Sequence, residues 1–423
     1  MRLLWTVSPV PSFLTSSGQA VRSPTDAAKS LRKIRFFSFV IAFALLLNVF
    51  LLLPSVCAEE SPLSLSVSAQ AAILIDADTG RVLYAKDAEH QLPMASTTKI
   101  MTALVAAASD VPTRVIRVDA GAVGIEGSSV YLYEGEELTL EQLLYAMLLE
   151  SANDAAAAIA IAIGGSIDAF ADAMNAKAKE LGLQHTHFTN PHGLDNEEHY
   201  TTAHDLALIA RAAIADPVLG KIFATRKTTI PLNNTQGVRL LLNHNKLLRL
   251  YDGAIGVKTG YTKRSGRCLV SAARRDGLTL IAVTLNAPDD WSDHTRMLDA
   301  GFSAFTRVTL CETGDSPQAF RSMVPVTGGM EGYVLVHNTA SLSLTLPRAH
   351  GSITCTVELP SFLYAPVSAE AVIGHLLFYC DLDGDGNREE IGRVPLTAVF
   401  SVERDPPKSL WHRLGAWFRA LFS

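Results

Sequence analysis

Residues 94–107, MASTTKIMTALVAA, are apolar enough to require burial, and yet they contain a lysine, Lys99, three residues after a serine, Ser96. An apolar segment of this kind predicts a helix in the interior of a domain, and a chain of 423 residues can bury one. Residues three apart share one face of a helix, so the two side chains would be neighbours. Burial disfavours the charged form of a lysine and lowers its pKa. A neutral amine beside a hydroxyl is a general base beside a nucleophile, so the segment predicts a reactive pair.

The spacing Ser-x-x-Lys is weak evidence by itself. A second copy, Ser30 to Lys33, lies in a basic segment just before a long apolar run, where catalysis is excluded. The structural alternative for Ser96 and Lys99 is a capped helix whose lysine extends to solvent.

Two further stretches favour chemistry over that alternative. Ser-Ala-Asn at 151–153 interrupts an apolar helical region, and Lys-Thr-Gly at 258–260 lies on an apolar strand. The order Ser-x-x-Lys, Ser-x-Asn, Lys-Thr-Gly, on a helix, a loop and a strand, is typical of penicillin-binding proteins and serine β-lactamases.

On these motifs the chain resembles the low-molecular-mass penicillin-binding proteins that are D-alanyl-D-alanine carboxypeptidases, the S11 peptidase family. The resemblance covers about residues 65–306 and rests on the stretches LIDADTGRVLYAKDA, MASTTKIMTALVA, LLESANDAAAAIA, NPHGLDNEEHYTTAHDLA, NHNKLL and DGAIGVKTGYTKRSGRCLVSAA. It implies an α+β fold: a β-lactamase/transpeptidase-like catalytic domain with an antiparallel sheet and helices, followed by a small all-β domain. It also implies an enzyme that removes the terminal D-Ala from peptidoglycan pentapeptide stems, needs no cofactor and is acylated by β-lactams.

The resemblance implies four catalytic residues. Ser96 would attack the carbonyl of the penultimate D-Ala and become acylated, with Lys99 as the general base. Ser151 would relay the proton toward the departing D-Ala. Asn153 would hold Lys99 and contact the substrate amide.

It also implies a substrate-binding strand. Lys258 would help keep Lys99 neutral and attract the terminal carboxylate, to which Thr259 would donate a hydrogen bond. Gly260 would leave room for the substrate, and the backbone N–H of Tyr261 would form an oxyanion hole with that of the nucleophile. Some family members place an arginine after the last strand to bind the carboxylate. Here that stretch, NAPDDWSDHTRML, has no arginine before Arg296, so carboxylate binding is expected to rest on the lysine and threonine, with modest affinity.

Periodicity and turn signals predict the organisation of a catalytic domain over 62–306. The expected elements are a β-hairpin at 71–88, a helical block at 138–164 broken near the Ser-Ala-Asn motif, a polar loop at 188–205, a helix at 205–216, consecutive strands over 252–286 and a closing helix at 294–306.

The C-terminal part changes character. Short β-rich runs between Gly, Pro and Asp turns predict an all-β domain over 310–402. Residues 408–423 return to a helical period with a Trp-rich apolar face and arginines away from it. This pattern predicts a helix lying in a membrane interface; packing on its own domain is the alternative.

We do not expect the N-terminal 58 residues to belong to a folded domain. A basic segment (29–35), a long apolar run and the small residue Ala58 are typical of an extension and a secretory signal cleaved after that alanine. An uncleaved anchor helix is the alternative. Either interpretation predicts an exported protein at the outer face of the cytoplasmic membrane and the cell wall.

Other activities fit the sequence less well. A class A β-lactamase needs a Glu-x-x-x-Asn loop between the second and third motifs, and Glu180, Glu197 and Glu198 all lack the asparagine. A peptidoglycan transpeptidase or endopeptidase with the same site, or a non-catalytic peptidoglycan-binding scaffold, stays open.

Metal sites are suggested by two stretches, but we predict none. Histidines crowd into 185–204, although no His-Glu-x-x-His motif occurs. Residues 381–392, DLDGDGNREEIG, match the first half of a calcium loop but end on Gly392 where a glutamate is needed, so a hairpin turn is expected.

Composition excludes one class of partner and leaves the cysteines open. A formal net charge of −6 without a basic stripe argues against nucleic acid. Beyond the signal, Cys268, Cys311, Cys355 and Cys380 include no Cys-x-x-Cys pair. We expect four buried thiols, with a bond between the last two as the alternative.

Overall fold

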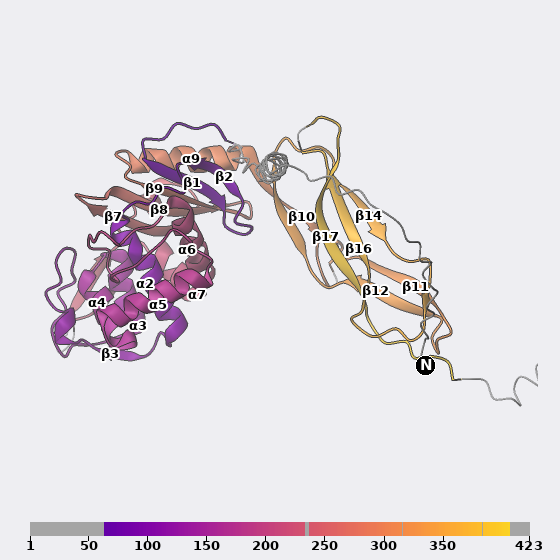
Figure 1. Ribbon diagram of the computed structural model, residues 1–423, viewed down its shortest axis with the longest axis horizontal. Helices are drawn as coiled ribbons and strands as arrows, with labels where there is room; N and C mark the ends of the chain where they lie inside the picture. The colour runs from indigo at the N-terminus through magenta and orange to yellow at the C-terminus, as the bar shows by residue number, and fades with distance from the viewer. Residues whose placement is uncertain (1–62, 233–236, 315, 383, 407–423) are drawn as a thin grey trace, which may run out of the picture. The chain divides into compact units, whose positions relative to one another are not determined.

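The computed structural model describes residues 63–232, 237–314, 316–382 and 384–406. Up to residue 304, the described chain forms an antiparallel sheet with helices on both faces, and the rest is β-rich (Figure 1). The α+β fold expected from the sequence is confirmed.

The sheet has the strand order β2–β1–β9–β8–β7, all antiparallel. Every residue of the central strand β9 is buried, as expected for a strand covered on both faces. β7 is an edge strand of this sheet, so one side of its backbone is open to other segments. The strands are β1 Ala71–Asp76, β2 Val82–Lys86, β7 Ala254–Thr262, β8 Gly266–Arg275 and β9 Leu278–Leu285.

Helix α9 packs on one face of the sheet, and α6 and α7 pack on the other (Figure 1). Local signals fix several helix starts: Thr139 and Gln142 form a capping box for α3, and Asp216 caps α7 before a proline. The helices are α2 Lys99–Ser109, α3 Leu140–Leu149, α4 Asn153–Gly164, α5 Ile167–Glu180, α6 Ala203–Ala215, α7 Pro217–Ala224, α8 Leu247–Leu250 and α9 Asp290–Ala304, with 3-10 turns η1 Ala95–Thr98 and η2 Ala120–Ala122.

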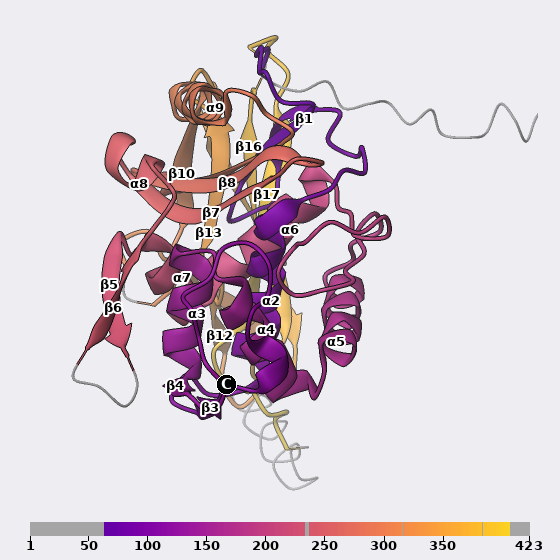
Figure 2. The ribbon, with the colours of Figure 1, turned by 90° about the vertical axis from the view of Figure 1, so that its left-hand side faces the viewer.

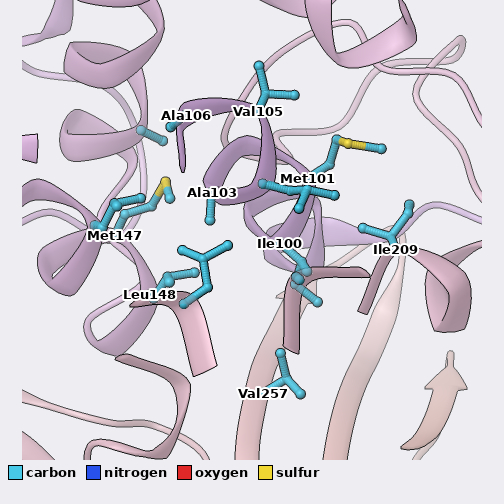
Figure 3. Close-up of a cluster of buried hydrophobic side chains, with 14 of the residues drawn as sticks. Ile100, Met101, Ala103, Val105, Ala106, Met147, Leu148, Ile209 and Val257 are labelled. Carbon is cyan, nitrogen blue, oxygen red and sulfur yellow. The ribbon is translucent and has the colours of Figure 1, made fainter. Parts of the chain in front are cut away.

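Helix α2 is the centre of the larger hydrophobic core. Its first eight residues, Lys99 to Ala106, are all buried. Figure 3 shows its apolar side chains among Met147 of α3, Ile209 of α6 and Val257 of β7. Each fully buried aliphatic side chain contributes about 1.5–3 kcal/mol, so the position of α2 is strongly fixed.

Two small two-stranded antiparallel sheets complete this part of the chain. β3 (Val115–Arg117) pairs with β4 (Glu137–Thr139), and β5 (Lys227–Pro231) pairs with β6 (Val238–Leu242) beside helix α3 (Figure 2). Arg239 of β6 joins the two regions through an ion pair with the fully buried Glu136.

The C-terminal part is all-β in its described residues, as expected. One sheet has the order β14–β16–β17–β12–β11–β15, and β10 pairs with β13. Small apolar clusters of its own, separate from the core around α2, stabilise it. The strands are β10 Phe305–Cys311, β11 Arg321–Thr327, β12 Tyr333–Asn338, β13 Leu342–Pro347, β14 Thr354–Glu358, β15 Leu363–Tyr364, β16 Val372–Cys380 and β17 Glu389–Ala398.

The Asp-Gly-rich stretch expected to be a hairpin turn joins the antiparallel strands β16 and β17. Asp381 accepts hydrogen bonds from the backbone N–H groups of Gly384 and Gly386, which closes the turn. Asp383 lies outside the described residues.

The cysteine prediction is wrong at one position. All four described cysteines are free, and three are buried, but Cys355 is exposed. It lies on β14, an edge strand of its sheet whose other residues are also largely exposed.

The expected elements of the catalytic region are present with shifted ends. The closing helix begins at Asp290 rather than at 294, since two aspartates in its first turn suit a helix N-terminus. The hairpin at 71–88, the break near 151 and the strands within 252–286 are confirmed.

In the described ranges, no single helix has the length and apolarity of a membrane span; the bent pair α4–α5 meets those criteria by length and composition. The predicted signal segment (1–58) and the predicted interfacial helix (408–423) lie outside the described residues.

Candidate active site

Ser96 lies in the 3-10 turn η1, directly before helix α2. The preceding residue, Ala95, has φ 47°, a backbone conformation that residues other than glycine rarely adopt. Lys99 follows one turn later, and its Nζ lies 2.8 Å from the Ser96 Oγ. The pair predicted from the sequence is therefore in hydrogen-bonding contact.

Lys99 is completely buried, and its Nζ has two other neighbours. These are the Asn153 Oδ1 at 2.7 Å and the backbone carbonyl of His192 at 2.6 Å. Burial lowers the pKa of Lys99 well below its ordinary value, and the charge of Lys258 lowers it further, against an opposing effect of Asp154.

All three neighbours of the Lys99 Nζ are oxygens, so a charged ammonium would donate to each of them; in the neutral amine they leave a single direction for the hydrogen bond with the serine. A neutral amine has two N–H donors and one lone pair. The Asn153 Oδ1 and the backbone carbonyl oxygen of His192 can only accept hydrogen bonds. The two N–H groups of Lys99 are used by these oxygens. Its lone pair is left for the hydroxyl of Ser96, which is the arrangement of a base about to accept a proton.

Ser151 and Asn153 lie at the break between α3 and α4. Ser151 has φ 61° and accepts a hydrogen bond from the Nζ of Lys258 at 3.0 Å. Asn153 starts α4; its Nδ2 donates to the carbonyl of Glu126, so its Oδ1 is turned to Lys99. The second motif thus connects the first to the third.

The third motif lies on the edge strand β7, which packs against η1. Lys258 is buried, and burial lowers its pKa to about 7. That Gly260 leaves room for the substrate stays a prediction, and the structure gives a further reason for a glycine: a Cβ there would lie 3.1 Å from both the Met94 carbonyl oxygen and the Ser96 nitrogen. The glycine lets the strand approach the backbone of the nucleophile.

A cavity of about 320 Å³ opens beside Ser96. Ser151, Thr259, Gly260 and Tyr261 of the predicted site line it, whereas the three buried groups Lys99, Asn153 and Lys258 lie behind this surface. The structure adds lining residues that sequence reasoning missed: Ser128, His244, Arg267, Asp290 and Trp291.

Arg267 could have been found from the hairpin. It is opposite Tyr261 in the register of β7 and β8, and opposite residues of antiparallel strands place their side chains on the same face. By contrast, Arg296, the first arginine after β9, pairs with Asp293 on α9 and does not line the cavity.

The histidine-rich loop at 188–205 supports the nucleophile from behind. His199 Nε2 lies 2.8 Å from Thr98 Oγ1, and burial lowers the pKa of His192 to about 3 and that of His199 to about 4, so both are neutral near pH 7. Gly193 lies so close to the nucleophile turn that a Cβ would lie 1.9 Å from the Ala95 carbonyl oxygen.

Among the described residues, no group of three or more His, Cys, Asp or Glu side chains is arranged to hold a metal ion.

Comparison with known proteins agrees with this geometry. Residues 56–289 match the family model Peptidase_S11, D-alanyl-D-alanine carboxypeptidase. The chain belongs to the S11 peptidase family.

Individual S11 proteins resemble most of the chain. The D-alanyl-D-alanine carboxypeptidase DacF of Bacillus subtilis (strain 168) is 32% identical over 80% of this chain and 87% of its own length. The crystal structure of penicillin binding protein 5 from Haemophilus influenzae aligns with a TM-score of 0.66 at 27% identity, covering 81% of this chain and 99% of that one. A solved Streptomyces K15 DD-transpeptidase aligns with a TM-score of 0.54 at 33% identity, over 56% of this chain and 99% of its own.

Replacing Gly193 by alanine is expected to destabilise the protein by at least about 3 kcal/mol, because the new methyl group overlaps the Ala95 carbonyl and the residue has φ +85°. Chemical denaturation measures the change. Gly182→Ala is the matched control: it also has a positive φ but opens onto free space, so only about 1 kcal/mol is expected. Equal losses in the two variants would contradict the tight fit of the loop behind Ser96.

Proposed function

We propose that this protein is a serine D-alanyl-D-alanine carboxypeptidase that removes the terminal D-Ala of peptidoglycan pentapeptide stems through an acyl-enzyme on Ser96. The observation that carries the proposal is the fully buried Lys99 amine, 2.8 Å from the serine hydroxyl, with its two other neighbours both acceptors. Membership of the S11 family supports the reaction class.

Acylation begins when Lys99 takes the hydroxyl proton of Ser96 as its oxygen attacks the carbonyl of the penultimate D-Ala. The new oxyanion would be bound by the backbone N–H groups of Ser96 and Tyr261. The close approach of β7 to η1 supports this pairing, since Gly260 lies against the Ser96 nitrogen.

The leaving D-Ala needs a proton on its nitrogen. Ser151, in contact with Lys258, is the proposed relay that passes the proton from Lys99 to this amine as the C–N bond breaks. Asn153 keeps the lysine aligned and contacts the substrate amide. Water then attacks the ester, the bond to Ser96 breaks, and the proton lost by water returns to the serine oxygen. No step calls for a metal or cofactor.

β-Lactams are proposed to acylate the same serine by opening their strained amide. The amine released in this step stays attached to the acyl group, so it continues to occupy the place that water would need. The sequence also lacks the Glu-x-x-x-Asn loop of class A β-lactamases. We expect a stable acyl-enzyme with benzylpenicillin.

Transpeptidation or endopeptidase activity with the same acyl-enzyme is the alternative that the comparisons favour most, because a solved relative is a DD-transpeptidase. A carboxypeptidase and a transpeptidase differ in whether water or an amine takes the acyl group, whereas an endopeptidase also uses water but releases another stem peptide instead of free D-Ala.

Ser96→Ala is expected to lower the release of free D-Ala from a peptide ending in D-Ala-D-Ala by at least about a thousandfold, since the nucleophile is lost. A chelator should leave the wild-type rate unchanged. Ser109→Ala, at the other end of α2 and far along the helix from η1, is the matched control and should keep full activity. Release that persists in Ser96→Ala, or that stops with the chelator alone, would place the chemistry elsewhere.

We further propose that the protein is exported and is held at the outer face of the membrane by residues 408–423. Support comes from the sequence alone: Trp411 and Trp417 share an apolar face with leucines and phenylalanines, and Arg413 and Arg419 lie away from it. The substrate also lies outside the cytoplasm.

Deleting 408–423 is expected to release the processed protein from the membrane fraction of expressing cells, because the apolar face is lost. Ultracentrifugation of lysates measures the distribution. Sedimentation of the truncated protein with membranes would instead place the anchor in an uncleaved N-terminal helix.

A further inference from the structure

Arg267, on strand β8, lines the same cavity as Ser96 and Thr259. One of its terminal nitrogens, Nη2, donates to Asp290 Oδ1 at 2.8 Å. Its Nε is buried, and within the described part of the chain it has no hydrogen-bond partner. The side chain as a whole is 43% exposed and lines the cavity, so it presents a cation to whatever the cavity binds, although the Nε itself is covered.

The guanidinium is held firmly in this place. Asp290 is almost fully buried in the first turn of α9, where its Oδ1 also accepts the backbone N–H of Trp291. A negative carboxylate is stable at this end of a helix. Since Asp290 is almost fully buried and binds one terminal nitrogen of Arg267, it acts as an anchor that fixes the arginine at the cavity wall.

Thr259 lies on the wall of the same cavity and carries a hydroxyl, which can donate a hydrogen bond. Asp290 and Trp291 line the cavity as well; the Asp290 carboxylate is already bound to Arg267, and the indole Nε1 of Trp291 is covered. A planar guanidinium beside a hydroxyl donor matches a carboxylate, which offers two acceptor oxygens in a plane.

Lys258 is less suited to that task than the sequence suggested. Its Nζ is buried, does not line the cavity, and is already engaged by the Ser151 hydroxyl and the Thr259 carbonyl. Lys258 is therefore buried beneath the cavity wall, whereas Arg267 lines the cavity.

We propose that Arg267, anchored by Asp290, binds the free α-carboxylate of the terminal D-Ala together with Thr259. The arginine that some family members place after the last strand is thus replaced here by one from the neighbouring strand β8. This assignment rests on the proposed carboxypeptidase function. It predicts a pocket that is selective for a substrate with an unblocked C-terminal carboxylate and that binds this carboxylate more tightly than Lys258 and Thr259 alone would.

The test compares ligands that differ only in this carboxylate. Benzylpenicillin and its methyl ester give acylation rates by intact-mass spectrometry, and peptides ending in D-Ala-D-Ala or its amide give release rates. Arg267→Gln is expected to lower the acylation efficiency for benzylpenicillin about 10–100-fold, the effect of losing a hydrogen bond to a charged group. The ester should change less than about threefold, because it makes no such bond.

Two further variants sharpen the comparison. Arg264→Gln removes the same charge from the exposed turn between β7 and β8, outside the cavity, and should leave both rates unchanged. Arg267→Lys keeps the charge without the planar fork and should recover part of the selectivity.

An equal loss for acid and ester in Arg267→Gln would overturn the proposal, because it would mean a structural role. Unchanged selectivity for the acid would also overturn it. Wild-type protein that accepts benzylpenicillin but releases no D-Ala would refute the carboxypeptidase function alone, and the comparison of acid with ester would still decide the role of Arg267.

Discussion

A lysine with no exposed surface beside a serine hydroxyl is the interaction on which the site depends. Taking an ammonium group out of water costs several kcal/mol, and a neutral amine avoids most of this cost. Burial and the nearby charge of Lys258 favour the neutral form of Lys99, in which two acceptor oxygens use its two N–H groups. These oxygens come from residues 54 and 93 positions further along the chain, so the base exists only in the folded protein.

The rest of the domain holds this arrangement against local strain. Ala95 and Ser151 are among the non-glycine residues with positive φ, and each lies at one of the serine motifs. Such conformations cost about 1–3 kcal/mol each and persist where the surroundings over-determine them. Three features supply those constraints: the buried face of α2, the close approach of β7 at Gly260, and the loop around Gly193. The same glycines show that the site is assembled by close backbone approach as much as by side chains.

Much of this was accessible from the sequence, for physical reasons. The apolar run around Lys99 and the break at 151 are local signals, and the order of the three motifs made their meeting predictable. The contact of Lys99 with the His192 carbonyl was not predictable, because a backbone oxygen carries no residue-type signal. Arg267 was missed since it lies in a hairpin register that must be known to one residue. The exposure of Cys355 depends on β14 being an edge strand, which composition does not reveal.

The most direct test is the protonation state of Lys99 itself. Nuclear magnetic resonance of protein labelled at the lysine ε-carbon follows each amine as the pH changes, and the signal that is lost in Lys99→Arg identifies this one. We predict a pKa of Lys99 far below the ordinary value of 10.5, with a neutral amine at the pH where the enzyme works. A Lys99 that stays protonated up to pH values near its ordinary pKa would contradict its assignment as the base that activates Ser96.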